Sequence, residues 1–202
     1  MKPEEMRKEI RAVLDETVNM EWEISVYADI MQSIETENTI KPFTRCAYEN
    51  YYGMVQAHLK KEWREKYFKY ADMCLSNKEK PTFYAAMKEI GKYGDDKMQP
   101  SFVSKLVHSI NKTEPIYDSK VKIFLEKEEP QGDSIEERIK SAIQIYEEIK
   151  RFYKNDEYAV LREQMLTVFD EKFPWAKEIS ETKKIDFVIW ALGKKRRKVS
   201  VF

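Results

Sequence analysis

The sequence predicts an all-α fold of roughly eight helices. Its 202 residues are 36% charged, 42% apolar and 13% aromatic, a mixture typical of a folded chain with a sizeable core. Only five glycines and seven prolines occur, whereas strand-rich folds need many turns built from these residues. Apolar residues recur at helical spacing, and we find no convincing alternation of the kind strands show. We therefore expect one all-helical domain over residues 1–202. Its most loop-like stretch, Glu126–Asp133, would be the hinge near 126–133 if the domain has two lobes.

The N-terminal half consists of helical patterns separated by prolines. Pro3 suits a first helical turn, and Glu4 suits the positive end of the helix dipole. Pro42 and Pro81 interrupt the pattern, because proline forces the residue before it out of the helical conformation. The expected elements are one long helix or two joined helices over 3–35, a long helix over 44–75, a short helix over 82–93 ended by Gly94, and a polar turn over 95–100.

The C-terminal half carries clearer helix boundaries. Ser134 and Glu137 have the spacing of a capping box, and Asp118 or Ser119 is placed to cap a short helix that runs to about Leu125. The other helices are expected over 101–111, behind Ser134, over 157–172 up to Pro174, and over 182–193. The last of these is apolar on nearly all sides, so Ile185, Ile189 and Trp190 are predicted to lie in the core.

Several classes of protein are excluded at this stage. The N-terminus is charged and has no apolar segment of the secretory type, and the longest strong apolar run, Phe187–Leu192, is too short to span a bilayer. The two cysteines, Cys46 and Cys74, cannot supply a zinc or iron–sulfur site. No glycine-rich phosphate loop occurs. We expect a cytoplasmic protein with no membrane segment, metal or cofactor.

Charge is balanced overall but unevenly distributed. The chain has 36 basic and 36 acidic residues. Residues 1–40 carry a net charge of −6, residues 97–122 carry +3, and residues 194–198 are all basic. A neutral total can therefore conceal one basic face, although solvated helix surfaces and a frayed tail would give the same pattern.

The helix over 101–111 has two chemically different sides. At about 100° per residue, its apolar side must pack inward. That side holds Phe102, Val103, Leu106, Val107 and Ile110. Ser101, Ser104, Lys105 and His108 fall within one arc on the other side, so we expect them to be presented together. A Ser104/His108 nucleophile pair has no obvious oxyanion donor nearby, which argues against acyl hydrolysis.

Asp118 follows Lys105 by thirteen residues, in the sequence Pro115-Ile116-Tyr117-Asp118-Ser119. Proline stiffens the approach, and backbone N–H groups at the start of a helix would keep the carboxylate ionised. Asp118 is therefore either an ordinary N-cap or a catalytic carboxylate. Lys105 is either a surface lysine or a functional amine.

These motifs resemble the signature region of the helix-hairpin-helix DNA glycosylase superfamily. The resemblance rests on Ser104-Lys105-Leu106-Val107-His108, on Pro115–Val121, and on Lys183-Lys184-Ile185-Asp186-Phe187 with Trp190. Uncharacterised bacterial proteins related to that superfamily carry similar motifs. The resemblance implies a two-lobed fold and base excision from double-stranded or damaged DNA, with the target nucleotide flipped into a pocket between the lobes. Asp118 matches the aspartate that stabilises charge on the sugar or activates water, and Lys105 approximately matches the Schiff-base lysine.

The chain also departs from this family. The segment Lys97-Met98-Gln99-Pro100 lacks the hairpin glycines, the interval from Lys105 to Asp118 is short, and the net charge is zero. Three functions stay open: an N-glycosylase or lyase, a non-catalytic nucleic-acid binder on the same fold, and an all-helical interaction protein of a bacterial defence or stress system. For the first two, the residues expected to contact nucleic acid are Lys97, Ser101, Ser104, His108, Lys112 and Lys120.

Overall fold

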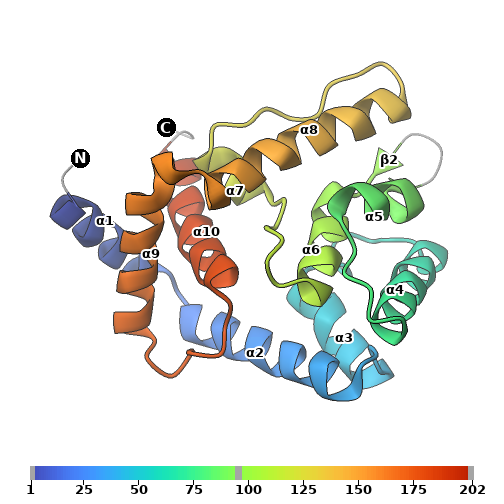
Figure 1. The fold of residues 1–202 in the computed structure, drawn as a ribbon, viewed down its shortest axis with the longest axis horizontal. Helices are drawn as coiled ribbons and strands as arrows, with labels where there is room; N and C mark the ends of the chain where they lie inside the picture. Colours follow the sequence, from blue (N-terminus) through green and yellow to red (C-terminus); the bar gives the residue numbers. More distant parts are fainter. Residues whose placement is uncertain (1–2, 94–96, 200–202) are drawn as a thin grey trace.

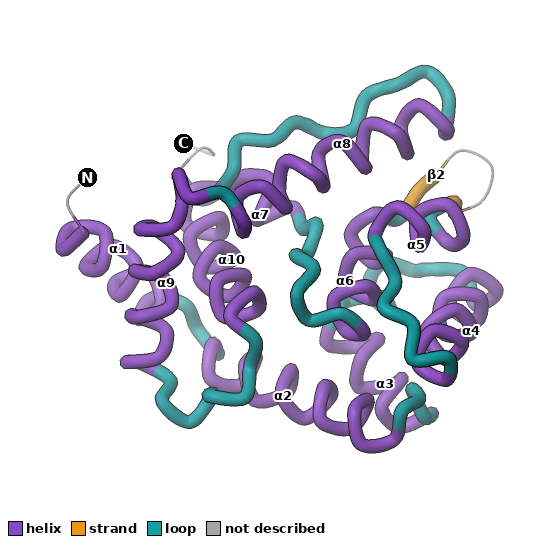
Figure 2. The backbone as a smooth tube through the Cα atoms, in the orientation of Figure 1, coloured by secondary structure: helices purple, strands orange, loops and turns teal. Residues whose placement is uncertain are grey.

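The computed structural model describes residues 3–93 and 97–199, with side chains up to Lys195, and it confirms the all-α class. Almost all of the described chain is helix or loop, and the strands form one short hairpin (Figure 2). In chain order the helices are α1 (Pro3–Glu16), α2 (Met20–Glu37), α3 (Pro42–Tyr51), α4 (Lys61–Ser76), α5 (Phe83–Ile90), α6 (Pro100–Ile110), α7 (Ser119–Phe124), α8 (Ile135–Lys154), the 3-10 helix η1 (Asp156–Tyr158), α9 (Ala159–Lys172) and α10 (Glu181–Val199). Strands β1 (Lys92–Tyr93) and β2 (Lys97–Met98) pair antiparallel between α5 and α6.

Both long helical patterns of the N-terminal half are divided. The first forms the two joined helices that were one of the expected alternatives, α1 and α2, which meet at Asn19, where φ is 65° and the backbone is left-handed. The prediction of one helix over 44–75 is wrong, because the chain turns between α3 and α4 through Gly53 (φ 73°) and His58 (φ 50°). The helix expected over 82–93 ends at Ile90, and the hairpin replaces its last residues. Gly94 and the first two residues of the expected polar turn lie outside the described residues, and the rest of that turn forms β2, Gln99 and the first residue of α6.

The helices form two groups that two longer helices connect (Figure 1). In the first group α10 packs against α1, α7 and α9, so the first and the last helix belong to it. In the second group α6 packs against α4 and α5. Helix α2 runs from the first group to α3, and α8 crosses the opposite side to reach α5. The expected hinge over 126–133 lies in the loop that joins α7 to α8.

The two helices that matter most for the site, α6 and α10, are both mainly buried. On α6, Val103, Leu106 and Val107 are buried as predicted, whereas Phe102 and Ile110 are half-buried. On α10, Ile185 and Ile189 are in the core as predicted. Trp190 is only partly buried, because its ring lines a cavity instead.

Helix α10 also fixes the position of α7. Gly193 lies so close to α7 that a Cβ atom there would stand 2.4 Å from the carbonyl oxygen of Lys120. Only glycine permits this approach without displacing backbone. Asp118 begins α7 as its N-cap, as predicted, so the glycine contact holds Asp118 against α10. The capping box of Ser134 and Glu137 at the start of α8 is also confirmed.

None of the helices over 3–93 and 97–199 combines the length and hydrophobicity needed to cross a bilayer.

Candidate functional site

A cavity of ≈ 240 Å³ opens where the two groups of helices meet. It is not the largest cavity of the described chain, but it gathers two lysines, three carboxylates and four aromatic rings. They come from α2, the end of α3, α6, the segment before α7, and α10. The lining residues are Glu23, Tyr51, Tyr52, Gly53, Lys105, Ile116, Asp118, Lys183, Asp186, Phe187 and Trp190.

Lys105 and Asp118 meet in this cavity as an ion pair. The Lys105 Nζ atom lies 3.5 Å from Asp118 Oδ2, and the two side chains are 13% and 20% exposed. The ammonium also lies 5.1 Å from the ring centroid of Phe102 and 5.4 Å from that of Tyr52. An amine and a carboxylate are thus held together in a pocket that solvent can enter.

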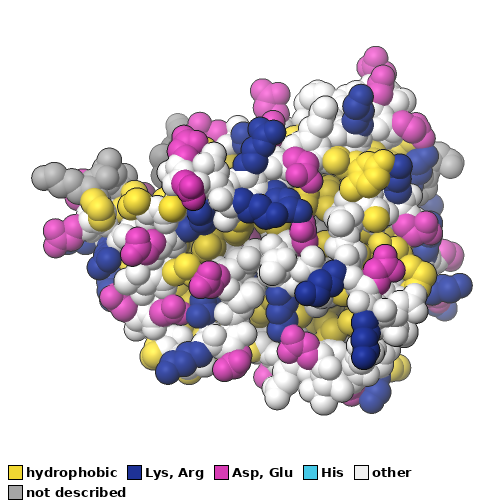
Figure 3. All heavy atoms as spheres, in the orientation of Figure 1, with side chains coloured by type: hydrophobic (Ala, Val, Ile, Leu, Met, Phe, Trp, Pro, Cys, Tyr) yellow, Lys and Arg dark blue, Asp and Glu magenta, His cyan; other side chains and the backbone are white. Residues whose placement is uncertain are grey.

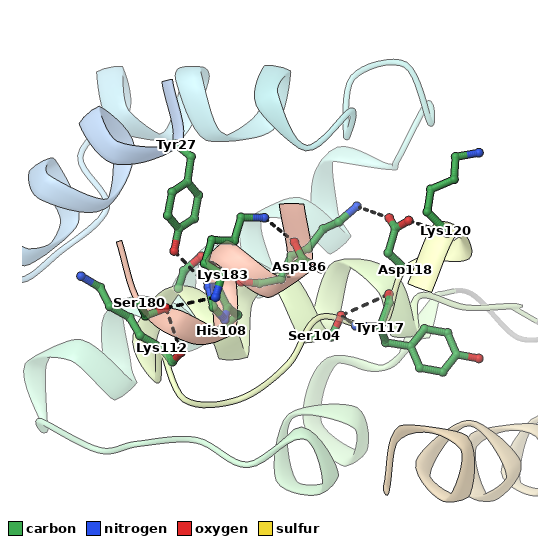
Figure 4. A network of polar contacts seen from close by, with 12 residues as sticks. Tyr27, Ser104, His108, Lys112, Tyr117, Asp118, Lys120, Ser180, Lys183 and Asp186 are labelled. Carbon is green, nitrogen blue, oxygen red and sulfur yellow. Dashed lines mark hydrogen bonds and ion pairs between the residues drawn. The ribbon is translucent and has the colours of Figure 1, made fainter. Parts of the chain in front are cut away.

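Ser104 is the residue that positions Asp118 beside α6. Its hydroxyl accepts a hydrogen bond from the backbone N–H of Tyr117 at 2.8 Å and donates to the carbonyl of Ser101 at 2.8 Å. One residue later, Asp118 Oδ1 accepts the N–H of Lys120 at 2.8 Å (Figure 4). The segment before α7 is therefore attached to α6 at the level of Lys105, and the second oxygen of Asp118 is left to face the amine.

Burial makes the amine of Lys105 easier to deprotonate. The lower polarity of the pocket lowers its pKa, the charge of Asp118 opposes that effect, and the charge of Lys183 adds to it. A lysine acts as a nucleophile only in the neutral form, so this environment favours covalent chemistry at Nζ.

Lys183 and Asp186 form a second, deeper pair on the first turns of α10. Their Nζ and Oδ2 atoms lie 2.6 Å apart, and the side chains are only 6% and 7% exposed. Burial raises the pKa of Asp186, and the adjacent Lys183 limits the effect. The Lys183 ammonium also lies over the ring of Phe187, at 4.4 Å from its centroid. In the sequence, Lys183 and Asp186 were recognised only as part of a motif. Their burial could not be predicted, because a buried Lys–Asp pair has the same spacing as an exposed one.

The expectation that Ser104 and His108 share an open face with Lys105 is wrong. Both side chains are fully buried, because α6 is covered on more sides than its apolar stripe indicates. His108 Nδ1 lies 2.7 Å from the carbonyl of Glu114, which can only accept, so Nδ1 donates. Nε2 then accepts from the hydroxyl of Tyr27 at 2.9 Å. Burial lowers the pKa of His108 to about 3, so this imidazole is neutral at physiological pH.

The other residues expected to contact nucleic acid are dispersed. Ser101 lines a neighbouring cavity together with Asp118, and Lys120 follows Asp118 on α7. Lys97 is exposed on the hairpin, and Lys112 is ion-paired with Glu35 of α2. On the face shown in Figure 3, basic and acidic side chains are intermingled. The side chains of residues 196–198 in the basic tail lie outside the described residues.

The sequence analysis did not identify the other residues of this cavity as site residues. Glu23, Tyr51 and Tyr52 belong to helical stripes that predict only packing, and Gly53 belongs to a turn that was expected to be helix. Only the fold brings them to Lys105. Among the described residues, no group of three or more His, Cys, Asp or Glu side chains is arranged to hold a metal ion.

Comparisons of this chain with protein-family models, with curated proteins and with solved structures found no match. The function must therefore be inferred from the geometry of the pocket.

Proposed function

We propose that the protein cleaves N-glycosidic bonds in DNA, with Lys105 and Asp118 as its catalytic residues. The observation that carries the proposal is the 3.5 Å contact between Lys105 Nζ and Asp118 Oδ2 inside one cavity. The resemblance of both motifs to helix-hairpin-helix glycosylases supports it, as does the position of the cavity between two groups of helices.

The two side chains have complementary chemistry. As the bond from the sugar C1′ to the base nitrogen breaks, its electron pair leaves with the base and positive charge develops on the sugar. The Asp118 carboxylate would stabilise that charge. The neutral Lys105 amine would attack C1′ and pass a proton towards the departing base. Opening of the sugar ring, with the electron pair going to its oxygen, would then leave a Schiff base on Nζ.

The walls of the cavity suit a flat ring. Tyr51, Tyr52, Phe187 and Trp190 surround the charged groups, and aromatic side chains are the usual partners of a flipped base. The cavity is also smaller than the roughly 300–1,000 Å³ typical of sites for drug-sized ligands, so a single ring system is a better match than a large ligand.

Reductive trapping tests the role of Lys105. Duplex DNA with an abasic site is mixed with the protein and borohydride, which converts a Schiff base into a stable crosslink. We expect wild type to crosslink, Lys105→Gln to lose the crosslink, and the control variant Lys61→Gln, at a lysine that is 77% exposed and lies outside the cavity, to keep it. Equal crosslinking of Lys105→Gln, or no crosslink with wild type, would rule out the lysine mechanism.

A non-catalytic interaction protein is the second candidate. It is favoured by the fact that Lys105 and Asp118 neutralise one another without a ligand and by the equal numbers of acidic and basic residues. In that case no intact, damaged or abasic duplex should bind at moderate salt, since phosphate contacts would contribute little.

A further inference from the structure

A second cavity, of ≈ 270 Å³, lies on the other side of Asp118. The start of α6, the start of α7 and the loop after α7 surround it. Its polar lining comes from Ser101, Tyr117, Asp118, Ser119, Lys122 and Glu129. Asp118 thus separates two cavities, one with Lys105 and one with Lys122.

Lys122 is a buried cation that is paired with an exposed anion. Its side chain is 8% exposed, and its Nζ atom lies 5.2 Å from the ring centroid of Tyr117. Its ion-pair partner is Glu129, which belongs to the irregular loop between α7 and α8 and is 76% exposed. A buried ammonium needs an anion, but an exposed carboxylate on a loop is held weakly and can be exchanged.

Tyr117 supplies an unused polar group at the same place. The residue is 2% exposed, and its buried hydroxyl has no hydrogen-bond partner among the described residues. A buried polar group without a partner is costly, and native proteins retain few of them. Pro100 and Ser101 at the start of α6 line the same cavity, and the N-terminus of this helix has no side-chain cap. Polar groups of more than one element therefore border the cavity.

Asp118 does not prevent an anion from entering. One of its oxygens accepts the N–H of Lys120, and the other faces Lys105 in the first cavity. The negative charge of Asp118 is thus compensated by groups of α7 and α6, whereas Glu129 is the carboxylate that pairs with Lys122.

We infer that this cavity is an oxyanion site in which the Glu129 carboxylate occupies the place of a phosphate and is displaced when a phosphate binds to Lys122. Free phosphate and a backbone phosphate of DNA share this chemistry. The identification of DNA as the source rests on the proposed function, whereas the site itself does not. Because both cavities meet at Asp118, a phosphate held by Lys122 would place a neighbouring nucleotide at the Lys105 cavity.

Binding of inorganic phosphate to the full chain tests the site, by calorimetry at low ionic strength. Glu129→Gln removes the competing charge and should bind phosphate about tenfold more tightly than wild type. Glu128→Gln removes another exposed charge from the same loop and should change affinity less than about twofold. Lys122→Met, added to Glu129→Gln, should abolish the gain, and Lys122→Arg should retain it.

Two results would overturn the inference: no tighter binding by Glu129→Gln, or tighter binding that persists without a cation at position 122. A duplex oligonucleotide distinguishes the sources, because a backbone phosphate site predicts the same order of affinities for DNA as for phosphate. If Glu129→Gln binds phosphate more tightly while no variant releases base or binds DNA, the proposed function fails and the oxyanion site stands.

Discussion

Both ion pairs in the first cavity join a lysine to an aspartate, yet they differ in distance and in burial. Lys183 and Asp186 lie 2.6 Å apart and are 6% and 7% exposed, whereas Lys105 and Asp118 lie 3.5 Å apart and are 13% and 20% exposed. The first pair comes from one turn of one helix, and the second joins α6 to the start of α7. The same two residue types thus form a short, more deeply buried contact in one case and a longer, more exposed contact in the other.

The largest effect is expected from breaking the buried pair. Asp186→Leu leaves Lys183 unpaired in the core, and Lys183→Met leaves Asp186 unpaired, so each should lower the free energy of unfolding by about 3–5 kcal/mol. The double variant removes both charges and should lose much less than either single variant. Urea unfolding of all four proteins measures this. Singles that lose under about 1 kcal/mol would show that the pair is solvated.

The free energy of unfolding should depend on pH because of the buried His108. Its ordinary pKa of about 6.5 falls to about 3 in the folded protein. The folded state therefore resists protonation, and His108 favours folding fully above pH 6.5 and progressively less as the pH falls toward 3. Between pH 7 and pH 5 the free energy of unfolding should fall by about 2 kcal/mol.

His108→Gln should remove this pH dependence from urea unfolding curves. The exposed His58 is the natural control, and His58→Asn suits its left-handed backbone. That control should keep the dependence. A slope that disappears in His58→Asn, or persists in His108→Gln, would contradict the assignment of a neutral, buried His108.

The close contact between α7 and α10 positions Asp118, the N-cap of α7, relative to Lys183 and Asp186 on α10. A methyl group in Gly193→Ala would stand 2.4 Å from the Lys120 carbonyl. We expect a net loss of about 1–2 kcal/mol, because overpacking outweighs the gain in helix propensity. Calorimetric melting measures the loss, and an increase in melting temperature would show that α7 moves away freely.

The more exposed pair should matter little for folding. Lys105→Met and Asp118→Asn should each change the free energy of unfolding by about 1 kcal/mol or less, because the pair borders a cavity in which water can hydrate the remaining partner, and asparagine caps helices as well as aspartate. Urea unfolding compares both variants with wild type. A loss as large as that of Asp186→Leu would make Lys105 and Asp118 a structural pair as well.

The sequence predicted local features more reliably than contacts between distant residues. The caps at Asp118 and Ser134 are properties of short segments, and the structure confirms them. It also confirms the burial of Val103, Leu106 and Val107 on α6 and of Ile185 and Ile189 on α10, whereas Phe102, Ile110 and Trp190 are only partly buried. The break between α3 and α4 was missed because the apolar spacing continues through the turn, while Gly53 and His58 adopt left-handed backbone.

The residues of the first cavity show the same limit, because contacts between distant segments could not be predicted from the sequence. Lys105 and Asp118 were selected from neighbouring motifs, whereas Glu23 and Tyr52 reach them only through tertiary packing. Ser104 and His108 were assigned to an open face because helical spacing shows which side is apolar, and it cannot show that the polar side is covered as well.

The most direct test of the central claim is base release by wild type and Asp118→Asn. The amide keeps the cap but cannot offset positive charge on the sugar or accept a proton from water. Both proteins are incubated with a panel of damaged duplexes, and released bases are quantified alongside melting temperatures. The proposal predicts base release from at least one duplex by wild type, no release by Asp118→Asn, an unchanged melting temperature, and DNA binding that persists or tightens. Equal release by the two proteins, or no release from any duplex, would contradict it.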